Sequence, residues 1–111
     1  TAVDLRDIGA VYDRAALIAL PTEMRRRYVE HMSAILAPNV ETLLITLSYP
    51  AGEMKGPPFS VTDAEVHALY DDKFAVRRLA ERDALEENAR LRARGLTGLT
   101  EQAYRLRRLG A

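Results

Sequence analysis

The sequence predicts an α/β protein. Short apolar runs that fit strands alternate with longer stretches of helical periodicity along the chain. One of these runs, residues 42–47 (TLLITL), is apolar at successive positions, as expected for a central parallel strand covered by helices on both faces. The chain has 111 residues, 48% of them hydrophobic and 29% charged, which indicates one globular domain.

The first expected elements are a strand and a helix in direct succession. Residues 8–12 form a short apolar run that fits a buried strand, and residues 15–20 are good helix formers. Pro21 must start, kink or break a helix. We therefore expect a break at Pro21 and a second helical piece capped by Thr22.

The second helical piece shows a four-residue spacing of large side chains, which predicts one buried stripe. The stripe is expected to consist of Met24, Tyr28, Met32 and Leu36. The side chains expected to face water are Arg25, Arg26, Arg27 and Glu30. Pro38 and Asn39 end this helix, so the helical region extends over about residues 15–36.

A long Pro/Gly-rich loop, PAGEMKGPPFSV at residues 50–61, follows the central strand. Long loops at the ends of strands often carry function. Thr62 and Glu65 then form a capping-box pattern, which predicts a helix over about residues 62–71.

The remaining elements are less regular. Residues 74–80 read as a strand near the sheet edge, because two arginines interrupt its apolar pattern. Residues 83–94 look helical up to the following glycine. Residues 99–109 fit a helix and a strand about equally well, so periodicity leaves both open.

Composition excludes several classes of function. The 16 basic and 16 acidic side chains balance, so nothing demands a nucleic-acid partner. No apolar window approaches the roughly 18 residues of a membrane span, and no signal peptide is visible, which makes a cytoplasmic protein the default. Cysteine is absent, so disulfides, thiolate metal sites and a cysteine nucleophile are excluded.

Common cofactor and metal motifs are also missing from these residues. The six glycines never form G-x-G, so neither a dinucleotide fingerprint nor a Walker loop is present. His31 and His67 have no partner at metal-ligand or triad spacing, and we expect no metal site. The RLRR run at residues 105–108 is interpreted as a solvated face rather than a phosphate site.

Asp13 and Arg14 lie where the first strand passes into the helix, and two interpretations are open. Ligands of α/β proteins bind at the carboxyl ends of the strands, so the pair could belong to a site. Alternatively, Asp13 caps the helix and Arg14 stacks on the sheet edge.

Taken together, the order of elements and several segments resemble the C-terminal half of thiopurine S-methyltransferases, especially bacterial ones. The segments that carry the resemblance are VYDRAALIALP (11–21), LLITLSY (43–49), GPPFSV (56–61), ERDALEENARLRARGL (81–96) and AYRLRR (103–108). The resemblance implies a class I methyltransferase (Rossmann-like) fold, with a mixed sheet whose last two strands are antiparallel. Residues 1–111 would then be the C-terminal part of one methyltransferase domain, without its N-terminal cofactor-binding half.

The resemblance also implies an activity. The family passes a methyl group from S-adenosylmethionine, without a metal, to the sulfur of thiopurines or of aromatic and heterocyclic thiols. The expected partner is a small thiol, and a monomer is expected for the full-length enzyme, whereas this fragment alone would be inactive. Two alternatives remain: a non-catalytic truncated or binding half-domain, and a related methyltransferase that acts on halide, selenium or tellurium species.

Site residues follow from the motif match. Arg14 is the expected catalytic and substrate-binding residue, because a permanently charged guanidinium can stabilise a thiolate. Tyr12 and Asp13 are expected beside the cofactor. The other substrate-binding residues implied are Pro57, Pro58 and Phe59, as an apolar wall, and Arg90, with Arg92 and Arg94 as alternatives. Residues 90–94 could equally well be basic side chains that complement a helix dipole.

In space, the resemblance and the pattern together predict one sheet. Its strands are expected near residues 9–12, 42–48, 74–80 and 102–108. The first two should be parallel and the last two an antiparallel pair.

Overall fold

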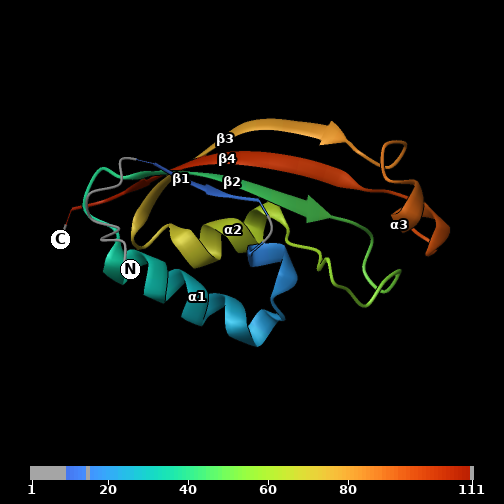
Figure 1. The fold of residues 1–111 in the computed structure, drawn as a ribbon, viewed down its shortest axis with the longest axis horizontal. Helices are drawn as coiled ribbons and strands as arrows, with labels where there is room; N and C mark the ends of the chain where they lie inside the picture. Colours follow the sequence, from blue (N-terminus) through green and yellow to red (C-terminus); the bar gives the residue numbers. More distant parts are fainter. Residues whose placement is uncertain (1–9, 15, 111) are drawn as a thin grey trace, which may run out of the picture.

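The computed structural model of the protein describes residues 10–14 and 16–110. Its elements are β1 (Ala10–Asp13), the 3-10 helix η2 (Leu17–Ala19), α1 (Thr22–Ile35), β2 (Glu41–Ser48), α2 (Asp63–Tyr70), β3 (Phe74–Asp83), α3 (Ala89–Ala93) and β4 (Thr100–Arg108), as Figure 1 shows. Strands and helices alternate, which confirms the α/β class. The predicted residues 8–9 of the first strand and residue 15 of the first helix lie outside the described residues.

The four strands form one mixed sheet in the order β1-β2-β4-β3. β1 runs parallel to β2, whereas β4 is antiparallel to both β2 and β3. The predicted parallel and antiparallel pairs and the edge position of β3 are therefore confirmed. The helical alternative for residues 99–109 is wrong, because Tyr104 and Leu106 alternate into the core and both are fully buried.

The helices α1 and α2 lie against the same face of the sheet (Figure 1). The expectation of helices on both faces of residues 42–47 is wrong for the described part of the chain. Leu44 on the helix side is fully buried, but its neighbour Leu43 is 40% exposed on the other side. We call this second side the open face of the sheet.

The hydrophobic core fills the layer between the sheet and α1 and α2. Its buried members include Leu17, Val29, Leu36, Leu44, Val66, Tyr70, Phe74, Tyr104 and Leu106. A second, smaller cluster consists of Ala84, Leu91, Leu96 and Leu99, and lies at the end of the sheet where α3 packs. Within residues 10–14 and 16–110, no helix combines the length and apolarity needed to cross a bilayer.

Of the predicted buried stripe, Leu36 is confirmed as buried, but the register predicted within α1 itself is wrong. The buried residues are Arg25, Val29 and Ser33, whereas Met24 is 48% exposed. Tyr28 and Met32 are only half-buried. The cap was also predicted one residue too late, because Pro21 holds the N-cap position without a side-chain bond and Thr22 is the first helical residue.

The segment predicted as a helix over residues 83–94 is mostly extended or looped. β3 continues to Asp83, and only Ala89–Ala93 is helical. The backbone N–H of Ala84 donates to the carbonyl of Leu99 (2.8 Å), which keeps this stretch against the partner strand instead of releasing it into a helix. The expected stop is correct, since Gly95 has φ +103° directly after the helix.

Candidate functional site

At the carboxyl end of β1, Asp13 is held by the protein itself. Its carboxylate is 5% exposed. Oδ1 accepts a hydrogen bond from the backbone N–H of Ala16 (3.2 Å), and Oδ2 accepts one from the hydroxyl of Tyr28 (2.6 Å). The first bond caps the turn before η2, as the capping interpretation of Asp13 predicts. Burial, and next the bond to Asp13, raise the pKa of Tyr28, so the phenol remains a hydrogen-bond donor.

Arg14 and Tyr12, the two neighbours of Asp13 in the chain, are both exposed. Arg14 is exposed at the bend after β1. Tyr12 is 62% exposed, and the alternation of side chains along a strand places it on the open face, opposite to Asp13. The structure therefore brings Asp13 toward α1 and separates it from Tyr12, although both were expected beside one cofactor.

Residues of the long loop join this end of the sheet through η2. The backbone N–H of Phe59 donates to the carbonyl of Ile18 (2.7 Å). Ile18 and Ala19 line a shallow hollow of about 290 Å³ together with Pro57 and Pro58. The apolar wall expected from the GPPF motif thus has a counterpart on η2, four residues after Arg14.

Glycine is required at the start of this wall. Gly56 has φ +81°, a conformation that residues with a side chain rarely adopt. A Cβ atom there would lie 2.5 Å from Cδ1 of the Phe59 ring. The ring therefore packs directly on the glycine backbone, which sets the direction of the loop.

The sequence pattern predicted that Arg25 faces water, and this prediction is wrong. Its side chain is 3% exposed. Nε donates to the carbonyl of Leu20 (3.0 Å), Nη1 contacts Oε2 of Glu65 (2.5 Å), and the guanidinium lies 5.7 Å from the centre of the Phe59 ring. Arg25 consequently links α1 to η2, α2 and the loop.

Glu65 forms only half of the predicted capping box. Its backbone N–H donates to Oγ1 of Thr62 (3.2 Å), as expected. Its carboxylate pairs with Arg25 instead of returning to the N-cap. The one available signal for Arg25 was its position four residues before Val29, on the stripe that is in fact buried.

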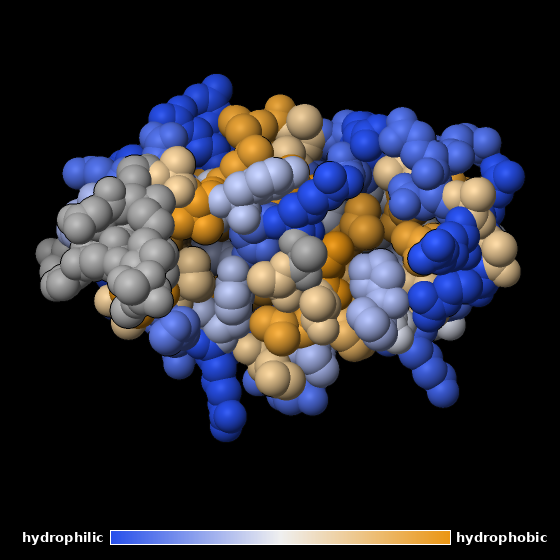
Figure 2. All heavy atoms as spheres, in the orientation of Figure 1, coloured by the Kyte–Doolittle hydropathy of each residue, from blue (hydrophilic) through white to orange (hydrophobic). Residues whose placement is uncertain are grey.

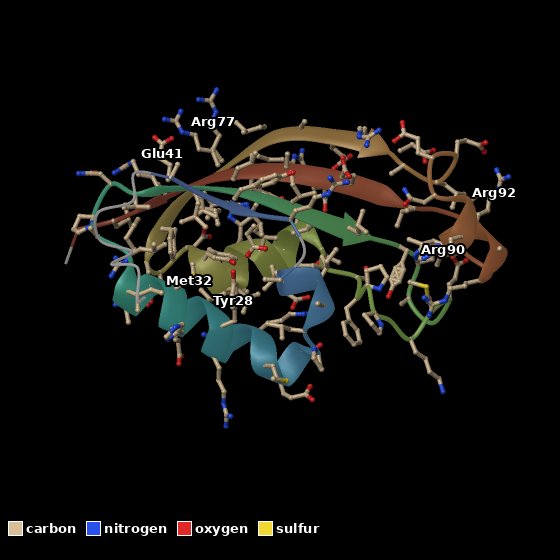
Figure 3. All side chains as sticks on the ribbon, in the orientation of Figure 1. Tyr28, Met32, Glu41, Arg77, Arg90 and Arg92 are labelled. Carbon is tan, nitrogen blue, oxygen red and sulfur yellow. The ribbon has the colours of Figure 1, made fainter. Side chains whose placement is uncertain are left out.

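The arginines of the segment 90–94 differ in their surroundings. Arg90 is exposed on α3, and Arg92 pairs with Glu86 (3.0 Å) on the outer side of α3 (Figure 3). Nη1 of Arg94 donates to the carbonyl of Pro57 (3.2 Å). Of the three arginines, Arg94 is the one that contacts the GPPF loop among the described residues, whereas Arg90 was the expected one.

Tyr49 completes the support of the wall from the end of β2. Its hydroxyl donates to the carbonyl of Pro58 (2.9 Å). Its backbone N–H also donates to Oγ of Ser60 (3.0 Å). Both bonds hold the loop at Pro58 and just after it.

The histidines and carboxylates of the described residues form no cluster of three or more that could hold a metal ion. His67 is bonded to Asp71 through Nδ1 (2.9 Å). Asp13, the expected cofactor residue, already uses two of the roughly four acceptor positions of a carboxylate. This end of the sheet has an apolar wall, and the exposed Arg14 lies four residues before Ile18, which lines the same hollow. An apolar wall combined with a guanidinium group suits a flat apolar ligand that carries an anionic group.

Comparison with known proteins identifies the same family that the sequence segments resemble. A family model described as thiopurine S-methyltransferase matches residues 1–109. The thiopurine S-methyltransferase of Xanthomonas campestris pv. campestris (strain 8004) is 52% identical over 104 residues, which are 94% of this chain and 48% of that protein. The thiopurine S-methyltransferases of Marinobacter nauticus (49% over 104 residues, 93% and 48%) and Azotobacter vinelandii (50% over 108 residues, 97% and 50%) are also similar. The chain therefore spans about half the length of the curated relatives that it matches.

Proposed function

Because the chain belongs to the thiopurine S-methyltransferase family, we propose that it is part of an enzyme that methylates the sulfur of thiopurines or of aromatic and heterocyclic thiols. S-Adenosylmethionine is the methyl donor in this proposal, and it supplies an electrophilic methyl group on a sulfonium. The residues proposed to act are those at the carboxyl end of β1 and in the GPPF loop.

One observation carries the proposal. The hydrogen bond from the N–H of Phe59 to the carbonyl of Ile18 (2.7 Å) joins two segments that lie 41 positions apart. It sets the GPPF loop against the helical turn that follows Asp13 and Arg14. The two motifs most specific to the family thus meet at one end of the sheet, where α/β proteins bind their ligands.

Arg14 is proposed to stabilise the substrate sulfur as a thiolate. A guanidinium stays protonated at every working pH, so it favours the anion without exchanging a proton. With the thiol proton released to water, the thiolate forms a bond to the methyl carbon by in-line displacement while the sulfonium–methyl bond breaks and a neutral thioether leaves. Alignment of the two reacting atoms supplies several kcal/mol, on the order of what effective-molarity arguments allow. No protein nucleophile is needed.

Substrate binding is proposed to use the wall of Pro57, Pro58 and Phe59. Rigid apolar residues can hold a flat heterocycle while the exposed guanidiniums orient its charge. Arg90 remains a candidate for that contact. Arg94 is the stronger structural support for the wall, because it bonds the carbonyl of Pro57 (3.2 Å).

Membership of the thiopurine S-methyltransferase family also supports a proposal for the fold and the domain. We propose that residues 1–111 are the C-terminal part of a class I (Rossmann-like) methyltransferase domain, whose N-terminal half holds most of the cofactor. The parallel pair β1-β2 and the antiparallel β4 support this. Tyr12 and Asp13 are proposed to approach the cofactor from opposite faces of β1, with Asp13 acting mainly through the turn it caps.

A chimera tests the function. In it, these 111 residues replace the matching half of the Xanthomonas campestris relative, and methylation of an aromatic thiol is measured with S-adenosylmethionine. We expect activity, and we expect Arg14→Ala to lower kcat/KM 10- to 100-fold, which corresponds to about 1.4–2.7 kcal/mol, with little change in cofactor affinity.

Two further variants sharpen the result. Arg14→Lys should recover part of the rate, because an ammonium keeps the charge but loses the planar fork. Arg26→Ala, an exposed arginine on α1, serves as the matched control and should act like the parent. An inactive but folded chimera would favour the non-catalytic alternative, and an unchanged rate in Arg14→Ala would remove Arg14 from the mechanism.

A further inference from the structure

A carboxylate in the first half of the long loop is bonded twice to the segment that follows α3. Oε1 of Glu53 accepts a hydrogen bond from the backbone N–H of Thr97 (2.9 Å), and Oε2 accepts one from the Thr97 hydroxyl (2.5 Å). The hydroxyl, and next the backbone N–H, lower the pKa of Glu53 below its ordinary value. The carboxylate is therefore ionised at neutral pH and keeps both bonds. We call this pair the Glu53–Thr97 clamp.

A tight turn brings Glu53 to this position. Its backbone N–H donates to the carbonyl of Pro50 (3.3 Å), and Gly52 in the turn has φ +85°, which favours glycine. On the other segment, Gly98 follows Thr97, and a Cβ atom at Gly98 would lie 3.7 Å from Cδ of Pro50. The two segments thus lie close together on both sides of the clamp.

A third bond continues from the clamp to the apolar wall. Nη1 of Arg94, three residues before Thr97, donates to the carbonyl of Pro57 (3.2 Å). Among the residues that the structure describes, these three hydrogen bonds are the ones that join residues 51–57 to other segments. Residues 58–61, in contrast, are bonded to β2, to the residue after it and to η2. The position of Pro57 consequently depends on residues 94–97.

An apolar contact accompanies these bonds. Met54 packs against the second cluster of Ala84, Leu91, Leu96 and Leu99. Figure 2 shows hydrophilic side chains gathered on the surface at the end of the molecule where Figure 1 places α3. Apolar burial is non-directional, whereas two hydrogen bonds to one carboxylate fix both distance and direction. The clamp, more than Met54, therefore sets the orientation of the loop.

We propose that Glu53 and Thr97 are positioning residues for the substrate: the clamp holds residues 94–97 and the apolar wall as one unit, and so fixes the distance of Pro57 and Pro58 from η2. The inference rests on the proposed function, in which the wall binds a flat aromatic thiol. The hollow that the two prolines line with residues of η2 measures about 290 Å³. A gap of about 0.5–1 Å forfeits roughly a quarter to a half of a van der Waals contact, so a small shift of the loop weakens binding of a flat ring.

This role has a kinetic signature. The prolines contact the ring and not the reacting sulfur, so they bind the ground state and the transition state equally. Loss of such uniform binding raises KM and leaves kcat unchanged. A residue that only stabilises the fold gives the opposite result, because a smaller folded fraction lowers the apparent kcat without changing KM.

Steady-state methylation by the chimera tests the proposal. Glu53→Ala removes both bonds and should raise KM for the aromatic thiol about fivefold or more, while kcat and KM for S-adenosylmethionine change less than about twofold. Thr97→Val keeps the N–H bond and should raise KM for the thiol about two- to threefold. Thr97→Ser keeps the hydroxyl and should act like the parent. Glu30→Ala, which removes an exposed carboxylate from α1, is the matched control and should leave all three constants unchanged.

Hydrogen exchange reads the position of the wall without activity. The N–H of Phe59 donates to the carbonyl of Ile18 (2.7 Å), so its exchange rate reports the contact between the wall and η2. We expect Glu53→Ala to speed this exchange about fivefold, because local opening is no longer opposed by the clamp. Glu30→Ala should leave it unchanged.

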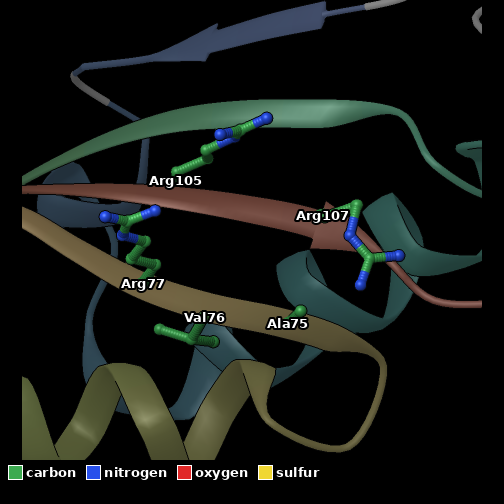
Figure 4. Close-up of a pocket in the computed structure, with 5 residues that line it drawn as sticks. All are labelled: Ala75, Val76, Arg77, Arg105 and Arg107. Carbon is green, nitrogen blue, oxygen red and sulfur yellow. The ribbon is translucent and has the colours of Figure 1, made fainter.

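A second hollow provides a competing location for an anionic thiol. Arg77, Arg105 and Arg107 line about 250 Å³ on the open face of the sheet, and Figure 4 shows their guanidinium groups. If the substrate bound there, Arg77→Gln with Arg107→Gln would raise KM for the thiol and Glu53→Ala would not. That result would overturn the proposal.

The two readouts also separate the clamp from the proposed function. Faster exchange at Phe59 with a parent-like KM in Glu53→Ala would overturn the positioning role and leave the methyltransferase proposal intact. An inactive but folded chimera with faster exchange at Phe59 would reject the proposed function and support the link between clamp and wall. Parent-like exchange at Phe59 would overturn that link.

Discussion

Replacing Arg25 tests whether a buried charge holds the loop beside the candidate site. Arg25→Ala removes the bond to the carbonyl of Leu20 (3.0 Å), the ion pair with Glu65 (2.5 Å) and the stacking on Phe59. A charge-assisted hydrogen bond contributes about 1.5 kcal/mol and a largely desolvated cation–π contact about 1 kcal/mol. Glu65 is 26% exposed, so water can partly solvate the carboxylate left behind, and its penalty is small, about 0.5 kcal/mol. The expected loss is about 3 kcal/mol.

Urea unfolding of the chimera measures this loss. With a slope of about 2 kcal/mol per molar urea, the midpoint should fall by roughly 1.5 M. Arg26→Ala, one position along and exposed, should change stability by less than about 0.5 kcal/mol. Equal midpoints for the two variants would refute the argument that the Arg25 contacts are stabilising.

A double replacement separates charge from packing. Arg25→Met with Glu65→Leu removes both charges, so it also removes the penalty of about 0.5 kcal/mol for the unpaired carboxylate of Glu65. It should therefore be more stable than Arg25→Met alone. If the double variant is as unstable as the single one, the unpaired carboxylate adds no penalty, and the whole loss comes from the contacts of Arg25 with Leu20 and Phe59.

Three further predictions concern the same region. Gly56→Ala should cost about 2 kcal/mol more in urea unfolding than Gly52→Ala, because both have positive φ (+81° and +85°) but only a Cβ at Gly56 would meet the Phe59 ring. Tyr28→Phe should cost about 2 kcal/mol at pH 7 by the same measurement, since it leaves Oδ2 of the buried Asp13 without its partner; a loss below 0.5 kcal/mol would contradict the bond. The pKa of Tyr28 is raised above its ordinary value of 10.0, so its contribution is complete below pH 10 and is lost as the pH rises above that value. The urea midpoint should accordingly fall above pH 10, and less so in Tyr28→Phe.

Local patterns were sufficient for most of the strands. The continuous apolar run of residues 42–47 predicted β2, and the arginine pair in residues 74–80 placed β3 at an edge. Residues 99–109 form a strand because β4 pairs with β2 on one side and with β3 on the other. A short sequence window contains neither partner, so its periodicity could not decide between helix and strand. The helix predicted over residues 83–94 failed for the same reason, because Ala84 is bonded to the carbonyl of Leu99.

The candidate site was predicted by motif, and the contacts that support it join residues far apart in the sequence. Arg25 has helical neighbours that suggest a water-facing position, but its partner Glu65 lies 40 residues away. The preference for Arg90 over Arg94 also rested on spacing, whereas the bond from Arg94 to the carbonyl of Pro57 spans 37 residues. Polar side chains become buried only when such partners exist, so their burial cannot be inferred from the residue type alone.

Asp13 shows how these contacts bear on the proposed chemistry. Its two oxygens bind the turn before η2 and the hydroxyl of Tyr28 on α1, so the carboxylate fixes the backbone on both sides of Arg14. In η2, the carbonyl of Ile18 accepts a hydrogen bond from the N–H of Phe59, and the Phe59 ring stacks on Arg25. The direction in which Arg14 leaves the sheet and the position of the apolar wall are therefore set by one connected group of hydrogen bonds. A variant of Tyr28 or Arg25 should consequently alter methyl transfer in the chimera by displacing Arg14 and the wall, even though neither side chain is proposed to touch the substrate.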